Sequence, residues 1–192
     1  MGISNFVIQR LLLPTTFIIL LFIGCDRILD ILSNSDHKSN HEKGEGLCIY
    51  LTKVEYTSDL SYQNFDIESV PILGNPIISY DDIISYDTTS HIVKLSFSRD
   101  SLKSKLGQIG VYGTPFLVIL DSSKIYGGWF WTSLSSIPCH WVVIETDCLF
   151  DSLKTNEIRI ILGYPNEDHF RGEDPRNNKK IFDRLVEDGK AE

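Results

Sequence analysis

The chain lacks an excess of basic residues, since its 18 Lys and Arg face 26 Asp and Glu and give a formal charge of −8 at pH 7. An acidic surface repels the phosphates of nucleic acids and anionic lipid headgroups. We therefore expect no nucleic-acid partner, and attachment to a membrane must depend on something other than basic charge. A hydrophobic content of 42% with 11% aromatic residues is enough for a real core.

The four cysteines form no C-x-x-C pair and no other spacing typical of a metal site. This argues against zinc and thioredoxin-like redox chemistry, and we expect neither a metal nor a cofactor. Besides Cys25 the chain has Cys48, Cys139 and Cys148, so at least one thiol stays unpaired or bridges to another chain. If residues 140–146 are extended, Cys139 and Cys148 lie about 30 Å apart and cannot bond each other, whereas Cys48 could bond either.

The apolar run at residues 11–24 is too short for a permanent membrane span. A helix of these 14 residues would rise about 21 Å, against the ~30 Å of a bilayer core, and Pro14 would weaken it. Arg10 precedes the run, and no acidic residue occurs before Asp26. The order of positive charge, apolar run and small residue predicts a cleaved secretory signal.

The end of this run, Phe22-Ile23-Gly24-Cys25, resembles the lipobox of bacterial lipoprotein signals. Ile23, Gly24 and Cys25 match the pattern, and Phe22 stands where Leu is usual. The resemblance implies cleavage after Gly24, a diacylglyceryl group on the Cys25 sulfur and a further acyl chain on its freed amine. Several chains anchor stably because each buried methylene contributes about 0.8 kcal/mol. The alternative is an ordinary cleaved signal, or an uncleaved anchor, with a chance cysteine.

Processing there would leave 168 residues with 17 basic and 26 acidic side chains, a formal charge of −9. Residues 25–45 include a polar stretch without apolar periodicity, which predicts a flexible tether. We interpret His37 and His41 as parts of this solvated linker rather than as metal ligands. The predicted organisation is a signal peptide at 1–24, a tether at 25–45 and a single globular domain at 46–192.

The domain sequence alternates between apolar segments and turn signals. We predict strands, the second of them weak, at residues 47–56, 64–73, 91–97, 114–121, 125–131, 141–144 and 158–162. Asn75-Pro76 indicates a turn, and Ser98 can cap a short helix. These elements predict an α+β domain with a mostly antiparallel sheet of five to seven strands and a C-terminal helix packed on it.

The C-terminal helix is predicted from its caps and its apolar spacing. Asp174 and Pro175 are typical of a helix start, and Gly189 is typical of a helix end. The apolar stripe that we expect to dock on the sheet consists of Ile181, Phe182, Leu185 and Val186.

Trp129 and Trp131 are the candidate binding surface. In a strand they share one face, and Phe130 takes the other. Two neighbouring indoles could form a platform for a sugar ring or an apolar peptide. The alternative, which we favour, is that one face belongs to the core and the other is covered by a neighbouring element. Aromatic residues serve as filling throughout a chain with 10 Phe and 8 Tyr.

No catalytic residue is predicted. Cys139 and His140 are adjacent on an extended chain and point to opposite faces, and no G-x-S-x-G motif surrounds the nearby serines. A Cys139 nucleophile would need a distant histidine such as His91 or His169. The loop at residues 166–173 has metal-capable side chains, but a solvated acidic loop is the better interpretation.

Three aspartates, Asp81, Asp82 and Asp87, could together bind calcium, but the EF-hand spacing is missing. A capped helical turn with a polar rim explains them better.

Two further resemblances concern the folded part. Residues 118–121 (Val-Ile-Leu-Asp) and 124–126 (Lys-Ile-Tyr) resemble the periplasmic head of the SecD protein-translocation subunit, where an apolar strand ends at a similar Leu-Asp turn. Residues 80–83, 130–132 and 173–176 (Tyr-Asp-Asp-Ile, Phe-Trp-Thr and Glu-Asp-Pro-Arg) are similar to motifs of an uncharacterised family of exported bacterial proteins. Neither resemblance implies a catalytic residue.

These features together predict a lipoprotein of the bacterial cell envelope, held to a membrane by lipid on Cys25, with its domain outside the cytoplasm. We expect a non-enzymatic binding or accessory domain for an envelope protein, peptide or glycan. One alternative is an exported thiol- or metal-assisted hydrolase, and another is a structural subunit of an envelope complex.

Overall fold

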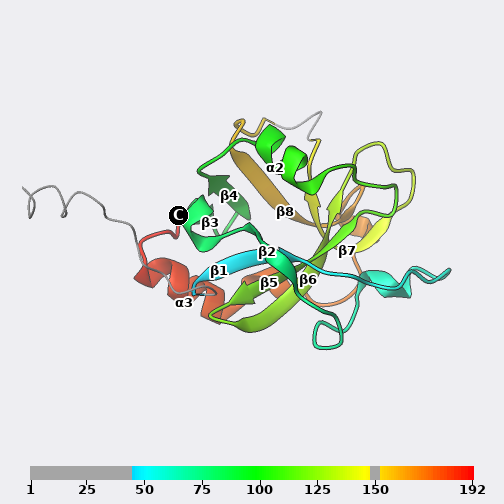
Figure 1. The fold of residues 1–192 in the computed structure, drawn as a ribbon, viewed down its shortest axis with the longest axis horizontal. Helices are drawn as coiled ribbons and strands as arrows, with labels where there is room; N and C mark the ends of the chain where they lie inside the picture. The colour runs from blue at the N-terminus through cyan, green and yellow to red at the C-terminus, as the bar shows by residue number, and fades with distance from the viewer. Residues whose placement is uncertain (1–44, 148–151) are drawn as a thin grey trace, which may run out of the picture. The chain divides into compact units, whose positions relative to one another are not determined.

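The computed structural model describes residues 45–147 and 152–192. The predictions for the signal peptide, Cys25, the tether and Cys148 fall outside these residues. Within the described part, one sheet of eight strands is accompanied by two α-helices (Figure 1). The α+β class is confirmed, whereas the predicted size of five to seven strands is wrong. Neither described helix has the length and apolar content that crossing a membrane requires.

The sheet is mixed but mostly antiparallel. Its strands are β1 (Leu47–Leu51), β2 (Leu73–Ile78), β3 (Ile83–Asp87), β4 (Ile92–Leu95), β5 (Thr114–Leu120), β6 (Ser123–Trp131), β7 (Cys139–Glu145) and β8 (Glu157–Tyr164). They follow the order β2-β1-β5-β6-β7-β8-β4-β3, and of these neighbours β6 and β7 alone are parallel.

The two edge strands, β2 and β3, are consecutive in the chain. Residues 79–82 join them and include the short 3-10 helix η2 (Tyr80–Asp82). Four residues span at most about 14 Å, so the sheet must curl until its edges approach each other. The Ser79 backbone N–H and hydroxyl both donate to the Asp82 carboxylate, at 2.8 and 2.7 Å. The capped turn predicted here is confirmed.

The strands predicted at residues 114–121 and 125–131 correspond to β5 and β6, which a tight turn joins as a hairpin. Its turn residues Asp121 and Ser122 have φ values of +45° and +67°, as a two-residue loop requires to match the strand twist. The prediction of a turn at Asn75-Pro76 is wrong, since both residues lie inside β2. Because β2 is an edge strand, the missing N–H of Pro76 is tolerated there.

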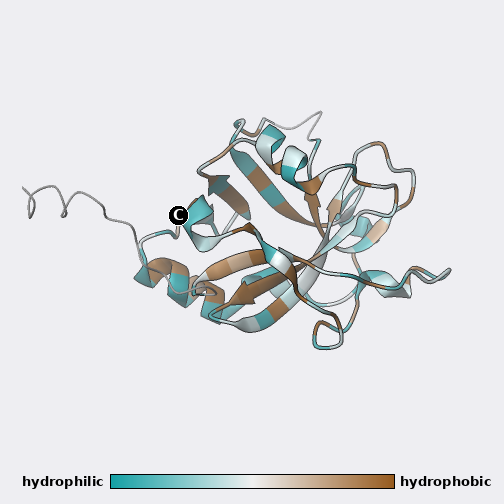
Figure 2. Ribbon diagram, in the orientation of Figure 1, coloured by the Kyte–Doolittle hydropathy of each residue, from teal (hydrophilic) through white to brown (hydrophobic). Residues whose placement is uncertain are grey.

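Two hydrophobic clusters lie on opposite faces of the sheet at β6 and β7. Phe130 and Ile144 belong to the larger cluster, while Trp129, Trp131 and Val143 belong to the smaller one. This alternation is the period of two that a strand imposes. Figure 2 shows brown, hydrophobic bands on several strands of the sheet.

Helix α2 (Arg99–Leu106) begins where the sequence predicted. The Ser98 side chain accepts a hydrogen bond from the Ser101 backbone N–H, and Leu102 is buried. Gly107, with φ of +70°, follows its last turn.

Helix α3 (Lys179–Glu187) begins later than predicted. Asp174 caps a separate 3-10 turn, η4 (Pro175–Asn177), and the Asn178 side chain caps α3. Gly189 lies just beyond the helix, as expected.

Only half of the predicted apolar stripe of α3 is buried. Ile181 and Leu185 pack in the larger cluster, whereas Phe182 and Val186 are 49% and 53% exposed. Successive helix residues are about 100° apart, so Phe182 and Val186 point beside the sheet rather than onto it.

Candidate functional site

The two tryptophans do not form a stacking platform. Trp129 and Trp131 are both 0% exposed, and the Trp129 indole N–H donates to the Gln63 carbonyl at 2.8 Å. Tyr62 and Phe65 meet the Trp129 ring edge to face, with centroids 5.4 and 5.9 Å away. The prediction of a binding surface at Trp129 and Trp131 is therefore wrong, and the alternative that a neighbouring element covers them is confirmed.

The covering element is the long connection between β1 and β2, residues 52–72. A connection of this length without regular strands is uncommon in a compact domain, and such loops often carry function. Figure 1 shows this cyan to green segment extending away from α3, toward the loops that precede β5 and follow β6.

Three loops meet at this end of the sheet: residues 52–72, 107–113 and 132–138. Tyr56 of the first donates to the Gly113 carbonyl at 3.4 Å, and its ring lies 5.6 Å from that of Tyr112. Ser135 of the third donates to the Val111 carbonyl at 2.7 Å. Loops held on a rigid sheet are the usual location of binding residues.

These loops expose a group of apolar side chains, which we call the tyrosine surface: Tyr56 (53% exposed), Val111 (49%), Tyr112 (49%) and Leu134 (82%). Single exposed apolar residues are ordinary, but four on loops that touch one another make a candidate contact site. Tyrosine offers an apolar ring face together with a hydroxyl that can donate or accept. Burial raises the pKa of Tyr56, so its hydroxyl stays neutral at physiological pH.

A buried aromatic layer supports the tyrosine surface from below. The Tyr56 ring packs against Tyr62 at 5.1 Å and against Trp129 at 6.0 Å. Gly113 has φ of +74°, and a Cβ there would lie 2.5 Å from the Trp131 ring. This position therefore requires glycine, which lets the loop that carries Tyr112 approach the indole.

The thiol and histidines considered for hydrolysis have other contacts. Cys139 is 0% exposed, and burial raises its pKa to about 12, so it is a protonated thiol rather than a nucleophile. The His91 Nδ1 lies 3.0 Å from the Tyr86 hydroxyl, and burial lowers the pKa of this imidazole. His169 bonds Asn166 through Nδ1 at 3.0 Å. Cys48 and Cys139 are both buried free thiols, so they do not bond each other.

Two of the three aspartates considered for calcium, Asp82 and Asp87, have structural roles. Asp82 caps its own 3-10 turn, and Asp87 accepts from the backbone N–H groups of Thr89 and Ser90. A hydrogen bond from the Ser90 hydroxyl, together with those two backbone bonds, lowers the pKa of Asp87. Across residues 45–147 and 152–192, no three His, Cys, Asp or Glu side chains are grouped so that they could hold a metal.

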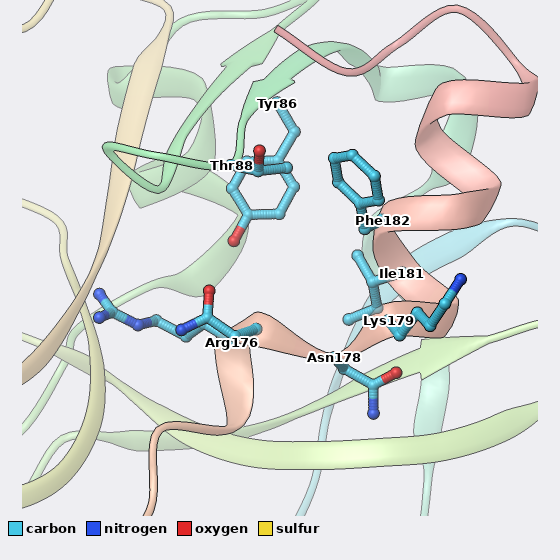
Figure 3. A pocket seen from close by; sticks show the side chains of 8 residues that line it. Tyr86, Thr88, Arg176, Asn178, Lys179, Ile181 and Phe182 are labelled. Atoms are coloured by element: carbon cyan, nitrogen blue, oxygen red, sulfur yellow. The ribbon is translucent and has the colours of Figure 1, made fainter.

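A cavity of about 290 Å³ lies between β3, η4 and α3. Its walls include Tyr86, Arg176, Ile181 and Phe182 (Figure 3). The Arg176 guanidinium donates to both Asp174 carboxylate oxygens, at 2.9 and 2.8 Å, and to a main-chain carbonyl. Figure 3 shows this guanidinium directed away from the cavity, so its charge stabilises η4 rather than preparing an anion site.

A larger groove of about 490 Å³ is formed by the connection at residues 52–72 itself. Its walls combine apolar and polar side chains, among them Lys53, Glu55, Tyr62, Phe65 and Val70. This mixed lining resembles protein-binding surfaces, in which polar groups surround a few apolar anchors.

No family model matches the chain, and searches of curated proteins and of solved structures find no match either. The resemblances to lipoprotein signals, to exported bacterial proteins and to the SecD head therefore stay predictions.

Sequence reasoning missed all four residues of the tyrosine surface. The signal was nevertheless present, because Val111 and Tyr112 lie between Gly110 and Gly113, and Leu134 lies within a serine-rich loop. Large apolar residues inside turn-forming segments have little chance of burial within a strand or helix.

Proposed function

We propose that the chain is a lipid-anchored binding domain of the bacterial envelope, and that its tyrosine surface captures a protein partner. The observation that supports this most is the exposure of Tyr56, Val111, Tyr112 and Leu134 on three loops over a buried aromatic layer. Rigid aromatic anchors lose little conformational entropy on binding, and Tyr is enriched at protein interfaces.

The shape of this surface favours a protein over a glycan. The rings of Tyr56 and Tyr112 are tilted by 49° rather than coplanar, so they do not offer one broad stacking face. Val111 and Leu134 add aliphatic contacts, which suit the apolar side chains of a protein better than the hydroxyl-rich edge of a sugar.

The position of the surface also supports the proposal. The Gly46 N–H donates at 2.8 Å to Asp121, directly after β5, whereas Tyr56 bonds Gly113, directly before β5. The seven residues of β5 extend about 20 Å at roughly 3.3 Å per residue. A domain attached to a membrane through its first residues would therefore present the tyrosine surface at its opposite end.

Photo-cross-linking in intact cells tests the binding role. A photo-reactive amino acid in place of Tyr112 should yield one main protein adduct, and Leu134→Asp in the same chain should abolish it. The matched control carries the photo-reactive residue in place of Val186, which is equally exposed but lies on α3. Adducts of glycan would identify the glycan alternative, and equal or absent adducts at both positions would contradict binding at this surface.

The same experiment addresses a structural subunit. A permanent envelope complex would give stoichiometric adducts that co-purify without cross-linking, whereas a capture domain gives a partial yield that depends on the partner's abundance.

Membrane attachment needs its own test. Mass spectrometry of the mature protein should find an acylated N-terminal Cys25, and Cys25→Ser should move the chain from the membrane to the soluble fraction. An N-terminus at Met1, or an unmodified Cys25, would contradict the lipid anchor while leaving the binding test unaffected.

A further inference from the structure

Residues 53–56 continue along the line of β1 before the connection turns back (Figure 1). The Thr52 N–H, one residue past the end of β1, still donates to the Pro115 carbonyl of β5 at 3.1 Å. At the far end of the segment, the Tyr56 hydroxyl donates to the Gly113 carbonyl, directly before β5, at 3.4 Å. Both ends of the segment therefore lie beside the chain that leads into β5.

The main chain of this segment is unpaired. Lys53, Val54, Glu55 and Tyr56 each have a main-chain N–H and C=O, and none of these groups forms a hydrogen bond within the described part of the chain. Their side chains begin to alternate as in a strand, because Lys53 and Glu55 are exposed and Val54 between them is half-buried. An extended segment with open main-chain groups is a template for pairing with another strand.

The open groups of Lys53 and Glu55 belong to the edge of the segment opposite β5. In an extended chain, successive residues direct their main-chain groups to alternate edges. Because the Thr52 N–H bonds β5, the main-chain groups of Lys53 and Glu55 face the other way. That edge is the one on which β1 pairs with β2.

Strand β2 does not extend far enough to cover this edge. β1 and β2 pair as far as Leu51 and Leu73, and the same antiparallel register would place Pro71 opposite Lys53. Proline has no N–H to contribute to a ladder. In place of a further pair lies the groove of about 490 Å³, whose walls include Lys53, Glu55 and Pro71. The groove therefore occupies the position that a neighbouring strand would take.

Hydrogen bonds hold the far wall of the groove in place. The Thr52 hydroxyl donates to the Pro71 carbonyl at 2.6 Å. The Lys124 ammonium donates to the carbonyls of Ile67 and Val70, at 2.8 and 2.9 Å. The groove is therefore preformed, and a partner that enters it has little chain to order on binding.

Two opposite charges mark the near wall of the groove. Lys53 and Glu55 lie two residues apart, so they share a face of the extended segment, and neither forms an ion pair with another described residue. Oppositely charged residues on paired strands stabilise a sheet. A strand in the groove would therefore be favoured by an acidic residue beside Lys53 and a basic residue beside Glu55. On the other face, half-buried Val54 favours an apolar residue.

We propose that an extended segment of the protein partner enters this groove as an added strand and pairs its main chain with Lys53 and Glu55. The segment alternates apolar and charged residues, with its acidic and basic side chains two positions apart. In this mode of recognition, main-chain hydrogen bonds supply affinity and alternate side chains supply specificity. The inference rests on the proposed function, because Tyr56 ends the same segment and belongs to the tyrosine surface.

Photo-cross-linking of the full chain in intact cells tests the pairing through its register. A photo-reactive amino acid in place of Lys53, or in place of Glu55, should give an adduct with the same protein that the Tyr112 position captures. Mass spectrometry should locate the two adducts on partner residues two positions apart, because paired strands advance together. Any other spacing would overturn the pairing.

The Tyr112 position separates this inference from the proposed function. Adducts there, with none at the Lys53 and Glu55 positions, would overturn the added strand and leave capture by the tyrosine surface intact. Absence of adducts at all three positions would overturn both.

An exchange of the two charges is the second test. Lys53→Glu with Glu55→Lys keeps the net charge but sets each charge beside a like charge of the partner, so the yield of the Tyr112 adduct should fall about fivefold. The matched control exchanges an exposed ion pair on α3, Lys179→Asp with Asp183→Lys, and should keep the full yield. An unchanged yield in the first variant, or an equal loss in the control, would overturn the proposed pairing.

Discussion

The two ends of strand β5 are built from different interactions. Near Gly46, Arg184 donates to Asp121 at 3.1 Å and to Asp188 at 2.6 Å. Lys190 donates to the carbonyls of Tyr80 and Ile83, at 2.6 and 2.7 Å, and lies over the Tyr80 ring. We call this the charged end. At the opposite end, the tyrosine surface rests on packed aromatic rings, and hydrogen bonds between neutral groups link its loops.

The two ends have different roles, because the charged end holds the fold together and the opposite end presents a surface. The charged end uses its ionic groups internally, to join the start of β1, the β5–β6 turn and the residues after α3. The tyrosine surface instead leaves about half or more of each of its apolar residues exposed. Exposed apolar area without an internal purpose is the property expected of a binding surface.

Glycine substitutions should produce the largest effects and should affect both ends equally. A Cβ at Gly46 would lie 2.2 Å from the Tyr80 ring, and one at Gly113 would lie 2.5 Å from the Trp131 ring, both at positive φ. Gly46→Ala and Gly113→Ala should each lower the free energy of unfolding by about 3 kcal/mol. Gly74→Ala, at φ of +62° with open space around it, should lower it by about 1 kcal/mol.

Urea unfolding measures these three changes. An effect at Gly113 no larger than at Gly74 would show that the loop can move away from Trp131, and the tyrosine surface would then lack the rigidity that we infer.

Substitution of Arg184 should show that the stability of the charged end depends on salt. Arg184→Met removes bonds to two carboxylates at a partly buried position and should lower the free energy of unfolding by about 1–2 kcal/mol. The loss should shrink in 1 M salt, because added ions weaken the pair in the parent. Lys179→Met on the same helix breaks an exposed pair with Asp183 and should change stability by about 0.5 kcal/mol or less. A loss independent of salt would indicate that packing, not charge, holds this end together.

Substitutions of Tyr56 and Tyr112 should distinguish a tyrosine that stabilises the fold from one that mainly contacts the partner. Tyr56 packs on buried Tyr62 and Trp129, so Tyr56→Ala should lower the free energy of unfolding by about 1 kcal/mol. Tyr112 meets Tyr56 at the surface, so Tyr112→Ala should change stability by less than about 0.5 kcal/mol. Both should weaken partner capture. If Tyr112→Ala leaves capture intact, Tyr112 is outside the contact area.

We also expect a pH dependence at the end of the sheet that carries the tyrosine surface. Burial raises the pKa of Asp147, but hydrogen bonds from Thr132 and Lys103 together lower it by more. The pKa of Asp147 therefore lies below the usual range. Stability from this carboxylate is present above the ordinary pKa near 4 and is lost as pH falls through the folded value.

Asp147→Asn tests this dependence. It should lower stability by less than about 1 kcal/mol at pH 6, and the difference from the parent should vanish once the pH has fallen below the lowered pKa of Asp147. A difference that persists at low pH would mean that the Asp147 carboxylate does not need its charge to hold the loop.

Local features were predictable from the chain because neighbouring residues determine them. The cap at Ser98, the turn at Asp121 and Ser122, and the opposite faces of Trp129 and Phe130 depend on contacts within a few residues. The strand order, the curl of the sheet and the burial of the tryptophans were not predictable, because they depend on segments that are distant in the chain.

The sequence by itself determined the acidic charge, the α+β class, most strand positions and the prediction of a lipid-bearing Cys25. Only the tertiary structure decided which apolar residues stay outside. Phe182 and Leu185 are both apolar residues of the predicted helix stripe, but Leu185 packs on the sheet and Phe182 points beside it. The loops that carry Tyr56, Tyr112 and Leu134 touch one another because they lie at the same end of the sheet. Hydrophobic burial depends on which surfaces remain available after the strands pair, and no local pattern contains that information.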